Sequence, residues 1–298
     1  MGSMNQNSAS GSSTESKAPA KSSVLRNALK MSFGTTLSRV LGLVREQLFA
    51  ALFTKDITDA WVQAWRIPNL FRRILGEGSL SVNFLPIFVE QKQRSVEDAK
   101  SFAAGFFTLL FVFLTVFTTL GVLFSEQLVR ILVATSYEQN LLKFERTVYF
   151  AQIMFGFIFM MSLFALFMAI LNAFEEFFWP AVAPTFFNIA MIVSTLLPAN
   201  LLPVSGETLA WGVLVGGVLQ VAVLLPRLKA LGFWPRFSLR VDWGPCRRVF
   251  YNMGPGLLGT GLMQMTVLVN SNFVSSLPEG SPSYIAWADR LLELPLSL

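Results

Sequence analysis

The chain has 298 residues, of which 53% are hydrophobic and 14% are charged, and its mean hydropathy is +0.56. Charged residues make up about a quarter of an ordinary soluble chain, so this composition is typical of a polytopic membrane protein. The lack of histidine excludes Ser-His-Asp triads and HExxH zinc sites, and a single cysteine excludes an internal disulfide framework. In a membrane protein, a net charge of +5 is expected mostly in loops and does not by itself indicate nucleic-acid binding.

Residues 1–23 are rich in Ser, Gly, Ala and Lys, which predicts a disordered tail. The opening Met1-Gly2-Ser3 ahead of Met4 resembles a cloning remnant, so we exclude it from the fold. No short apolar stretch with a cleavage site follows, so the tail lacks the pattern of a signal peptide.

Eight segments after the tail approach the roughly 20 apolar residues that a membrane-spanning helix needs. Five of them carry no charge, namely 101–124, 147–174, 177–206, 208–225 and 250–277. The prolines in the third of these predict that its helix ends near Leu197. Three weaker segments contain arginines, namely 24–53, 58–89 and the stretch from 283 onward. The expected fold is therefore an all-α polytopic membrane bundle of about eight transmembrane helices.

The basic residues predict how the bundle is oriented and divided. Most Lys and Arg residues lie in the tail and in the loops after the second, fourth and sixth segments, which predicts a cytoplasmic N-terminus. Ala64-Trp65-Arg66 aligns with Ala288-Asp289-Arg290, a faint repeat of the kind found in transporters with duplicated halves. We therefore expect a first lobe over 24–226, a basic cytoplasmic loop over 227–248 and the start of a second lobe over 249–298. The apolar end of the chain is too short to complete an eighth helix, which predicts a C-terminal truncation.

Six arginines lie inside or at the rim of these apolar segments. An arginine in hydrocarbon costs several kcal/mol, so it is normally kept there by a partner or by a water-filled cavity. Its guanidinium stays charged and offers a fork of donors that matches phosphate. The pattern predicts an internal cationic cavity for an anion such as a phosphate or diphosphate, lined by Arg39, Arg45, Arg66, Arg72, Arg73 and Arg290.

Helical spacing places Ser38, Gly42 and Arg45 on one face of the first segment. Arg39 lies about 100° away from Ser38 on an ideal helix, so one straight face does not collect both arginines. The alternative for these arginines is that they snorkel toward the helix ends.

In the second segment, Asp59, Gln63, Arg66, Arg73 and Glu77 fall near one face, although Pro68 can kink the helix. Asp59 and Glu77 are expected to hold neighbouring arginines by ion pairs. Two alternatives stay open: the pair at 72 and 73 can anchor a helix end, and the adjacent residues Asp289 and Arg290 can neutralise each other.

The chain has no P-loop and no nucleophile–base pair, which argues against an enzyme. Translocation of an anionic amphiphile fits the predicted cavity better. No cofactor and no metal site are expected.

Several motifs also follow one another in a recognisable order. Residues 38–46 read SRVLGLVRE, 58–60 TDA, 66–73 RIPNLFRR, 76–81 GEGSLS, 184–189 PTFFNI, 216–220 GGVLQ, 253–255 MGP and 288–295 ADRLLELP. Together they closely resemble the MurJ family, also called MviN, of lipid II flippases in the MOP exporter superfamily. The resemblance covers about residues 24–298.

The resemblance implies fourteen helices in two six-helix lobes with two further helices, of which this chain holds the first lobe and two helices of the second. It implies that Arg39, Arg45, Arg72 and Arg290 bind the diphosphate-sugar head group of lipid II while the polyprenyl tail stays in the membrane. Asp59, Glu77 and Ser283 match other positions that matter in the family. It further implies alternating access in the bacterial inner membrane. Coupling to the membrane potential or to a cation stays unassigned.

Three alternatives remain at the level of sequence. One is a sister exporter that moves another polyprenyl-linked oligosaccharide or a cationic drug, although a drug exporter would favour acidic cavity residues. Another is a non-transporting scaffold that binds cell-wall synthesis proteins. The third is an anion channel, for which the sequence offers no evident filter. The expected partners are lipid II or a similar polyprenyl-diphosphate glycolipid and membrane lipids, with no nucleic acid.

Overall fold

The computed structural model describes residues 21–74 and 80–297, without the side chains of 21–31, 290, 291 and 293–297. The described residues form helices and no strand, so the expected all-α fold is confirmed. In chain order the helices are α1 (Lys21–Leu52), α2 (Lys55–Phe71), α3 (Ser81–Arg94), α4 (Val96–Leu123), α5 (Ser125–Leu132), α6 (Thr135–Glu138), α7 (Leu141–Ala173), α8 (Phe178–Leu196), α9 (Glu207–Ala222), α10 (Leu225–Ala230), α11 (Trp243–Ser275) and α12 (Ser281–Ser297). Residues 1–20 of the tail predicted over 1–23, and Glu77, lie outside the described residues. Residues 21–23 belong to α1, so the disorder predicted for them is wrong.

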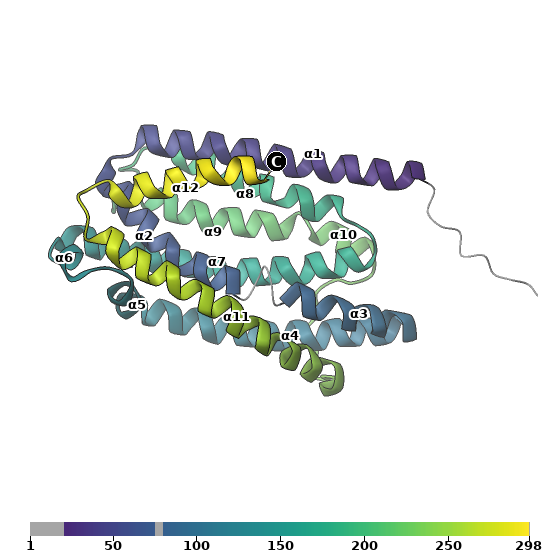
Figure 1. The fold of residues 1–298 in the computed structure, drawn as a ribbon. Helices are drawn as coiled ribbons and strands as arrows, with labels where there is room; N and C mark the ends of the chain where they lie inside the picture. Colours follow the sequence, from purple (N-terminus) through teal and green to yellow (C-terminus); the bar gives the residue numbers. More distant parts are fainter. Residues whose placement is uncertain (1–20, 75–79, 298) are drawn as a thin grey trace, which may run out of the picture.

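The long helices run back and forth along one axis (Figure 1). Four described stretches are long and apolar enough to cross a membrane, namely α4, α7, α8 and Glu207–Ala230, with mean hydropathies of 2.4, 2.5, 1.4 and 2.1. We expected α11 to belong with them because it lacks charge after residue 248. Its glycines and amides leave it outside this group.

The expected second spanning segment consists of two helices. After Phe71 the chain continues as a π-helical turn over residues 72–74, and α3 begins at Ser81. Pro68 lies inside α2 just before this break, where its missing N–H weakens the regular hydrogen-bond ladder. Because α2 and α3 run in the same direction (Figure 1), together they replace one continuous helix. The break places Arg72 and Arg73 along the length of the bundle, away from its ends.

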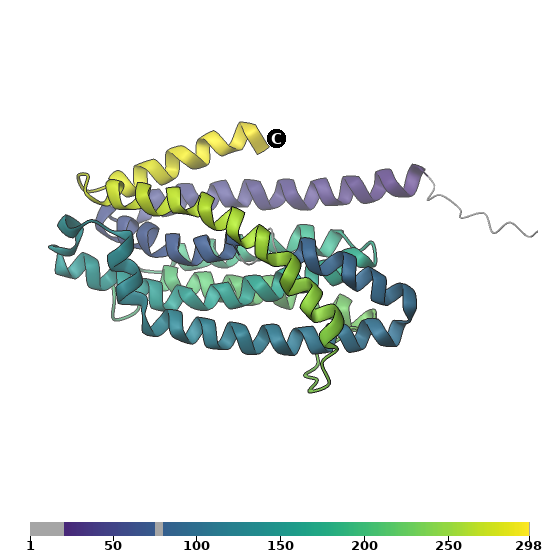
Figure 2. The ribbon, with the colours of Figure 1, turned by 60° about the horizontal axis from the view of Figure 1, so that its bottom comes forward.

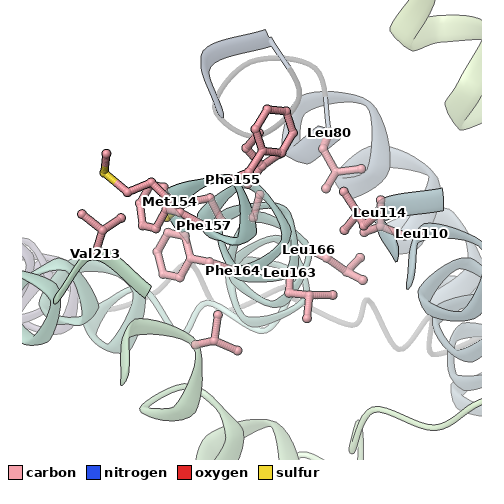
Figure 3. Close-up of a cluster of buried hydrophobic side chains, with 14 of the residues drawn as sticks. Leu80, Leu110, Leu114, Met154, Phe155, Phe157, Leu163, Phe164, Leu166 and Val213 are labelled. Atoms are coloured by element: carbon pink, nitrogen blue, oxygen red, sulfur yellow. The ribbon is translucent and has the colours of Figure 1, made fainter. Parts of the chain in front are cut away.

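The core is built around α7, whose buried residues point in every direction from its axis. Figure 3 shows Met154, Phe155, Phe157, Phe164 and Leu166 of α7 among leucines of α4 and Val213 of α9. A helix that is apolar all round is expected at the centre of a bundle. Since lipid tails are as apolar as these side chains, close packing rather than escape from water holds such helices together.

Small residues let α8 approach both α1 and α9. A Cβ added at Gly34 of α1 would lie 2.8 Å from Val182, and one added at Gly212 of α9 would lie 2.1 Å from Ser194. A Cβ at Gly216 would lie 2.6 Å from the ring of Phe187. These contacts fix α8 between its neighbours, which positions Asn188 of α8 beside the cationic residues of α1.

Candidate functional site: an arginine-lined cavity

An open cavity of about 1150 Å³ lies between the helices. Residues of α1, α2, α7, α8, α9, α11 and α12 line it. This volume is at the upper end of, or beyond, the ~300–1,000 Å³ of ordinary small-molecule pockets. Its wall carries two carboxylates, Glu46 and Asp289, against five arginines: Arg39, Arg45, Arg66, Arg72 and Arg73.

Arg45 is held at the cavity wall by α8. Its guanidinium donates to Asn188 Oδ1 at 3.0 Å and pairs with Glu46 at 2.5 Å. It also lies 5.8 Å from the ring centroid of Phe187. The amide of Asn188 donates in turn to the backbone oxygen and to the hydroxyl of Ser38, at 2.8 and 3.2 Å. One amide therefore orients Arg45 while joining α1 to α8.

Arg39 also lines the cavity, with an exposed side chain. Ser38 and Arg45 share the wall with it, so the cavity extends around more than one face of α1. Gly42 lies between them, where a Cβ would come 3.7 Å from Asn188. Both arginines of this helix therefore reach one space although they are not on one helical face.

The arginines of α2 and of the π-helical turn that follows it continue the cationic wall. Arg72 donates twice to Asn69 Oδ1, at 3.0 and 2.8 Å. Arg66 is partly buried, and Asp289 of α12 lies within electrostatic range of it. Trp65 stacks on Trp61 with centroids 5.6 Å apart and planes 13° apart, which gives this part of the wall an aromatic surface. Arg73 is exposed and lines the same space, away from the bundle ends where an anchoring role would place it.

Asp59 does not line the cavity, and the ion pair that we expected with a neighbouring arginine is not formed. Its buried carboxylate accepts from Lys143 Nζ of α7 at 2.9 Å and from the backbone N–H of Gly280 at 2.7 Å. The backbone N–H and the hydroxyl of Ser283 donate to its other oxygen at 3.1 and 2.6 Å. The first turn of α2 lies beside α7 and the start of α12, whereas the arginines of α2 lie farther along the helix. Asp59 therefore ties α2, α7 and α12 together at one end of the bundle.

The remaining predicted site residues fall into two groups. Asp289 lines the cavity, and Ser283 is fully buried against Asp59 and Thr58. Arg290 belongs to α12, but its side chain is outside the described part of the structure, and so is Glu77.

Sequence reasoning missed several polar residues of this region. Asn188 and Lys143 make the contacts described above, and further amides line the cavity: Asn69, Gln220, Gln264 and Asn270. The signal available at positions 188, 220, 264 and 270 was an amide inside a charge-free segment, because such a group needs a hydrogen-bond partner in a membrane. Among the described residues, no group of three or more Cys, Asp or Glu could hold a metal ion.

The fold and the cavity define a polytopic helical membrane protein with an open, arginine-lined cavity between its helices. The model of the family described as "Lipid II flippase MurJ" matches residues 48–298. The chain belongs to this MurJ family.

Relatives agree with this assignment, and a solved structure shares the fold. A probable lipid II flippase MurJ of Bdellovibrio bacteriovorus is 48% identical over 92% of this chain and 53% of its own length. A lipid II flippase MurJ of Burkholderia cenocepacia is 37% identical over 92% of this chain and 54% of its own. A solved structure titled "Lipid II flippase MurJ, inward closed conformation" shares the fold, with a TM-score of 0.72 and 24% identity over 90% of this chain and 55% of that one. The chain thus spans about half the length of the relatives it matches.

Proposed function

We propose that the protein acts in flipping lipid II, the lipid-linked precursor of peptidoglycan, from the inner to the outer leaflet of the bacterial cytoplasmic membrane. The arginine-lined cavity carries this proposal. A diphosphate is strongly disfavoured in hydrocarbon, and fixed guanidinium groups in a polar chamber replace the water that it loses. The names of the relatives support the same substrate. Because the chain spans half their length, transport is proposed for the complete protein.

In this proposal, Arg39, Arg45, Arg72 and Arg290 bind the diphosphate-sugar head group. Ser38, Arg66, Arg73, Glu77 and Asp289 would support them by orienting or balancing their charges. The polyprenyl tail would remain in lipid. It would pass out of the cavity between α1 and α12, which diverge in Figure 2.

Alternating access would open the two ends of the chamber in turn. The contact of Asp59 with Ser283 and Gly280 joins α2 to α12 at one end of the bundle. Breaking it would release the head group on that side, which the distribution of basic loops assigns to the periplasm. The basic end, with the N-terminus, would face the cytoplasm. We further propose that residues 24–226 form one lobe and 249–298 begin a second, with the basic loop 227–248 between them.

The test is native mass spectrometry of the detergent-purified chain titrated with lipid II. The Arg39→Ala/Arg45→Ala variant should lose at least tenfold in affinity, because each charge-assisted hydrogen bond is worth about 1.5–3 kcal/mol. Arg94→Ala/Arg130→Ala is the matched control, since it removes two exposed arginines outside the cavity. Its binding should equal that of the unchanged chain.

Two results would contradict the proposal. Equal lipid II affinity in both double variants would mean that the arginines of α1 do not bind the head group. Tighter binding of a polyprenyl-linked oligosaccharide other than lipid II would favour a sister exporter. Undecaprenyl diphosphate without sugars should bind through the same arginines but more weakly, because it lacks contacts with the amides and Trp65.

A further inference from the structure

The segment between α10 and α11, residues 231–242, lies against the side of α4. Figure 2 shows it projecting from the flank of the bundle at the foot of α11, and Figures 1 and 2 place it on the side opposite α12. The ring of Phe237 packs on Phe107 and Phe111 of α4, with centroids 5.3 and 5.0 Å apart. The backbone N–H of Ser238 donates to Thr108 Oγ1 at 2.9 Å. The segment is therefore docked on α4 and does not extend freely from the end of the bundle.

Its contacts begin at the charged end of α4, where a spanning helix is expected to meet the boundary between lipid head groups and acyl chains. Lys100 is the last charged residue of α4, and the contacts of the segment run from Lys100, beside Gly232, to Phe111. At 1.5 Å per residue they extend roughly 16 Å from Lys100 along the apolar part of α4. Interfacial elements bury their apolar face about 5–10 Å into this boundary.

The exposed side chains of this region have the composition of an interfacial element. Leu239 is 100% exposed and Phe237 66%, while Trp234 and Trp243 are exposed at 46% and 65%. Tryptophan is enriched where one part of a side chain meets lipid and another meets water. Four large apolar side chains this exposed would be unfavourable in water, and acyl chains would cover them.

Cationic groups accompany these apolar side chains. Arg236 and Arg240 are exposed, and neither pairs with a carboxylate within the part of the chain that the structure describes. Arg236 and Lys100 flank a small apolar slot of about 60 Å³ between α4, α7 and the segment. Among the described residues, Lys100 forms an ion pair with the exposed Glu97, at 3.0 Å, and such a pair is easily exchanged for another anion.

We propose that this surface binds an anionic phospholipid from the leaflet at the basic end of the bundle. The lipid phosphate would lie between Lys100, Arg236 and Arg240, and its acyl chains would lie along Trp234, Phe237 and Leu239. Long cationic side chains can reach the head groups from this depth while their stems stay in the apolar layer. The site is separate from the arginine-lined cavity, because Arg236, Arg240 and Lys100 do not line that space.

The experiment uses the full chain in detergent and phosphatidylglycerol with a diazirine in its acyl chain. After photolysis, adducts should map to residues 231–243 and to the facing stretch of α4, and phosphatidylcholine with the same acyl chain should give far fewer. Binding of phosphatidylglycerol, measured by native mass spectrometry, should fall about thirtyfold in Arg236→Gln/Arg240→Gln. Each arginine near an anionic lipid surface contributes roughly a fivefold factor.

Two further variants separate charge from folding. Arg236→Lys/Arg240→Lys keeps the charge and should keep most of the binding, and Arg94→Gln/Arg130→Gln loses the same charge elsewhere and should bind like the unchanged chain. Equal labelling by both lipids, or unchanged binding in the first Gln variant, would overturn the proposal. So would full displacement of the lipid by an equal concentration of glycerol 3-phosphate, which would indicate a site for a free phosphate ester.

Discussion

Asn188 shows how one uncharged side chain can determine the position of a cation. Its amide oxygen accepts from the Arg45 guanidinium at 3.0 Å, and its amide nitrogen donates to the backbone oxygen of Ser38 at 2.8 Å. A carboxylate oxygen of Glu46 lies 2.5 Å from the same guanidinium. Without Asn188, the strongest contact of Arg45 in this group would be Glu46, which would neutralise it. The amide therefore keeps one side of the guanidinium directed along the cavity wall.

Asn188→Ala should lower the affinity of the purified chain for lipid II about tenfold, because a hydrogen bond to a charged group is worth roughly 1.5–3 kcal/mol. Native mass spectrometry measures this directly. Asn272→Ala is the matched control, since Asn272 is exposed on α11 and does not line the cavity. Similar affinities of the two variants for lipid II would show that Arg45 binds the head group without help from Asn188.

At the scale of helices, the bundle is held at one end by a buried ion pair and along its length by close contacts. The Asp59 and Lys143 side chains are 0% and 9% exposed, and they connect α2 to α7. Removing one member of such a pair leaves an uncompensated buried charge, whereas replacing both can be nearly neutral.

Asp59→Asn should therefore destabilise the protein by about 3–5 kcal/mol. The midpoint of thermal unfolding in detergent should fall, and Asp59→Asn/Lys143→Met should recover part of the loss. Asp56→Asn is the control on the same helix, because Asp56 pairs with Arg146 near the surface and should contribute less than about 1 kcal/mol. A double variant as unstable as the single one would show that Asp59 stabilises the protein through Gly280 and Ser283 and not through Lys143.

The contact of α8 with α9 gives a second prediction at this scale. Gly216→Ala places a Cβ 2.6 Å from the Phe187 ring, and such overpacking typically costs about 1–3 kcal/mol. Nothing lies within 4 Å of a Cβ at Gly259 of α11, so Gly259→Ala should be neutral or up to about 1 kcal/mol more stable. The midpoints of thermal unfolding of the two variants in detergent measure this difference in stability. Equal midpoints would mean that Phe187 moves aside without cost.

For the whole molecule, the helix directions place several basic parts of the chain together at one end (Figure 1). The start of α1, the turn from α3 to α4 and α10 lie there, while α5, α6 and the start of α12 lie at the other end. This arrangement makes the predicted orientation testable with one residue from each end.

Cysteines at exposed Gln93 and Gln139 should react differently with a membrane-impermeant maleimide. Buried Cys246 is replaced by alanine as background. Gln139→Cys should be labelled in intact cells, and Gln93→Cys only after the membrane is permeabilised, because the basic end is predicted to be cytoplasmic. The reverse pattern would place the N-terminus outside.

The sequence by itself determined the all-α membrane class, the four most apolar spanning segments and the presence of cationic residues in other helical segments. A bilayer requires long apolar helices, and a charge within them stands out from composition alone. Helical spacing also placed Ser38 and Arg45 together, because periodicity within one helix does not depend on its neighbours.

Only the tertiary structure decided which helices meet and therefore which side chains act together. Asn188 is 143 residues from Arg45, and Lys143 is 84 residues from Asp59. Helical periodicity cannot reveal such pairs, because it says which face a residue is on and not what packs against that face. The break between α2 and α3, the width of the cavity around α1 and the docking of residues 231–242 on α4 likewise depend on packing between distant segments.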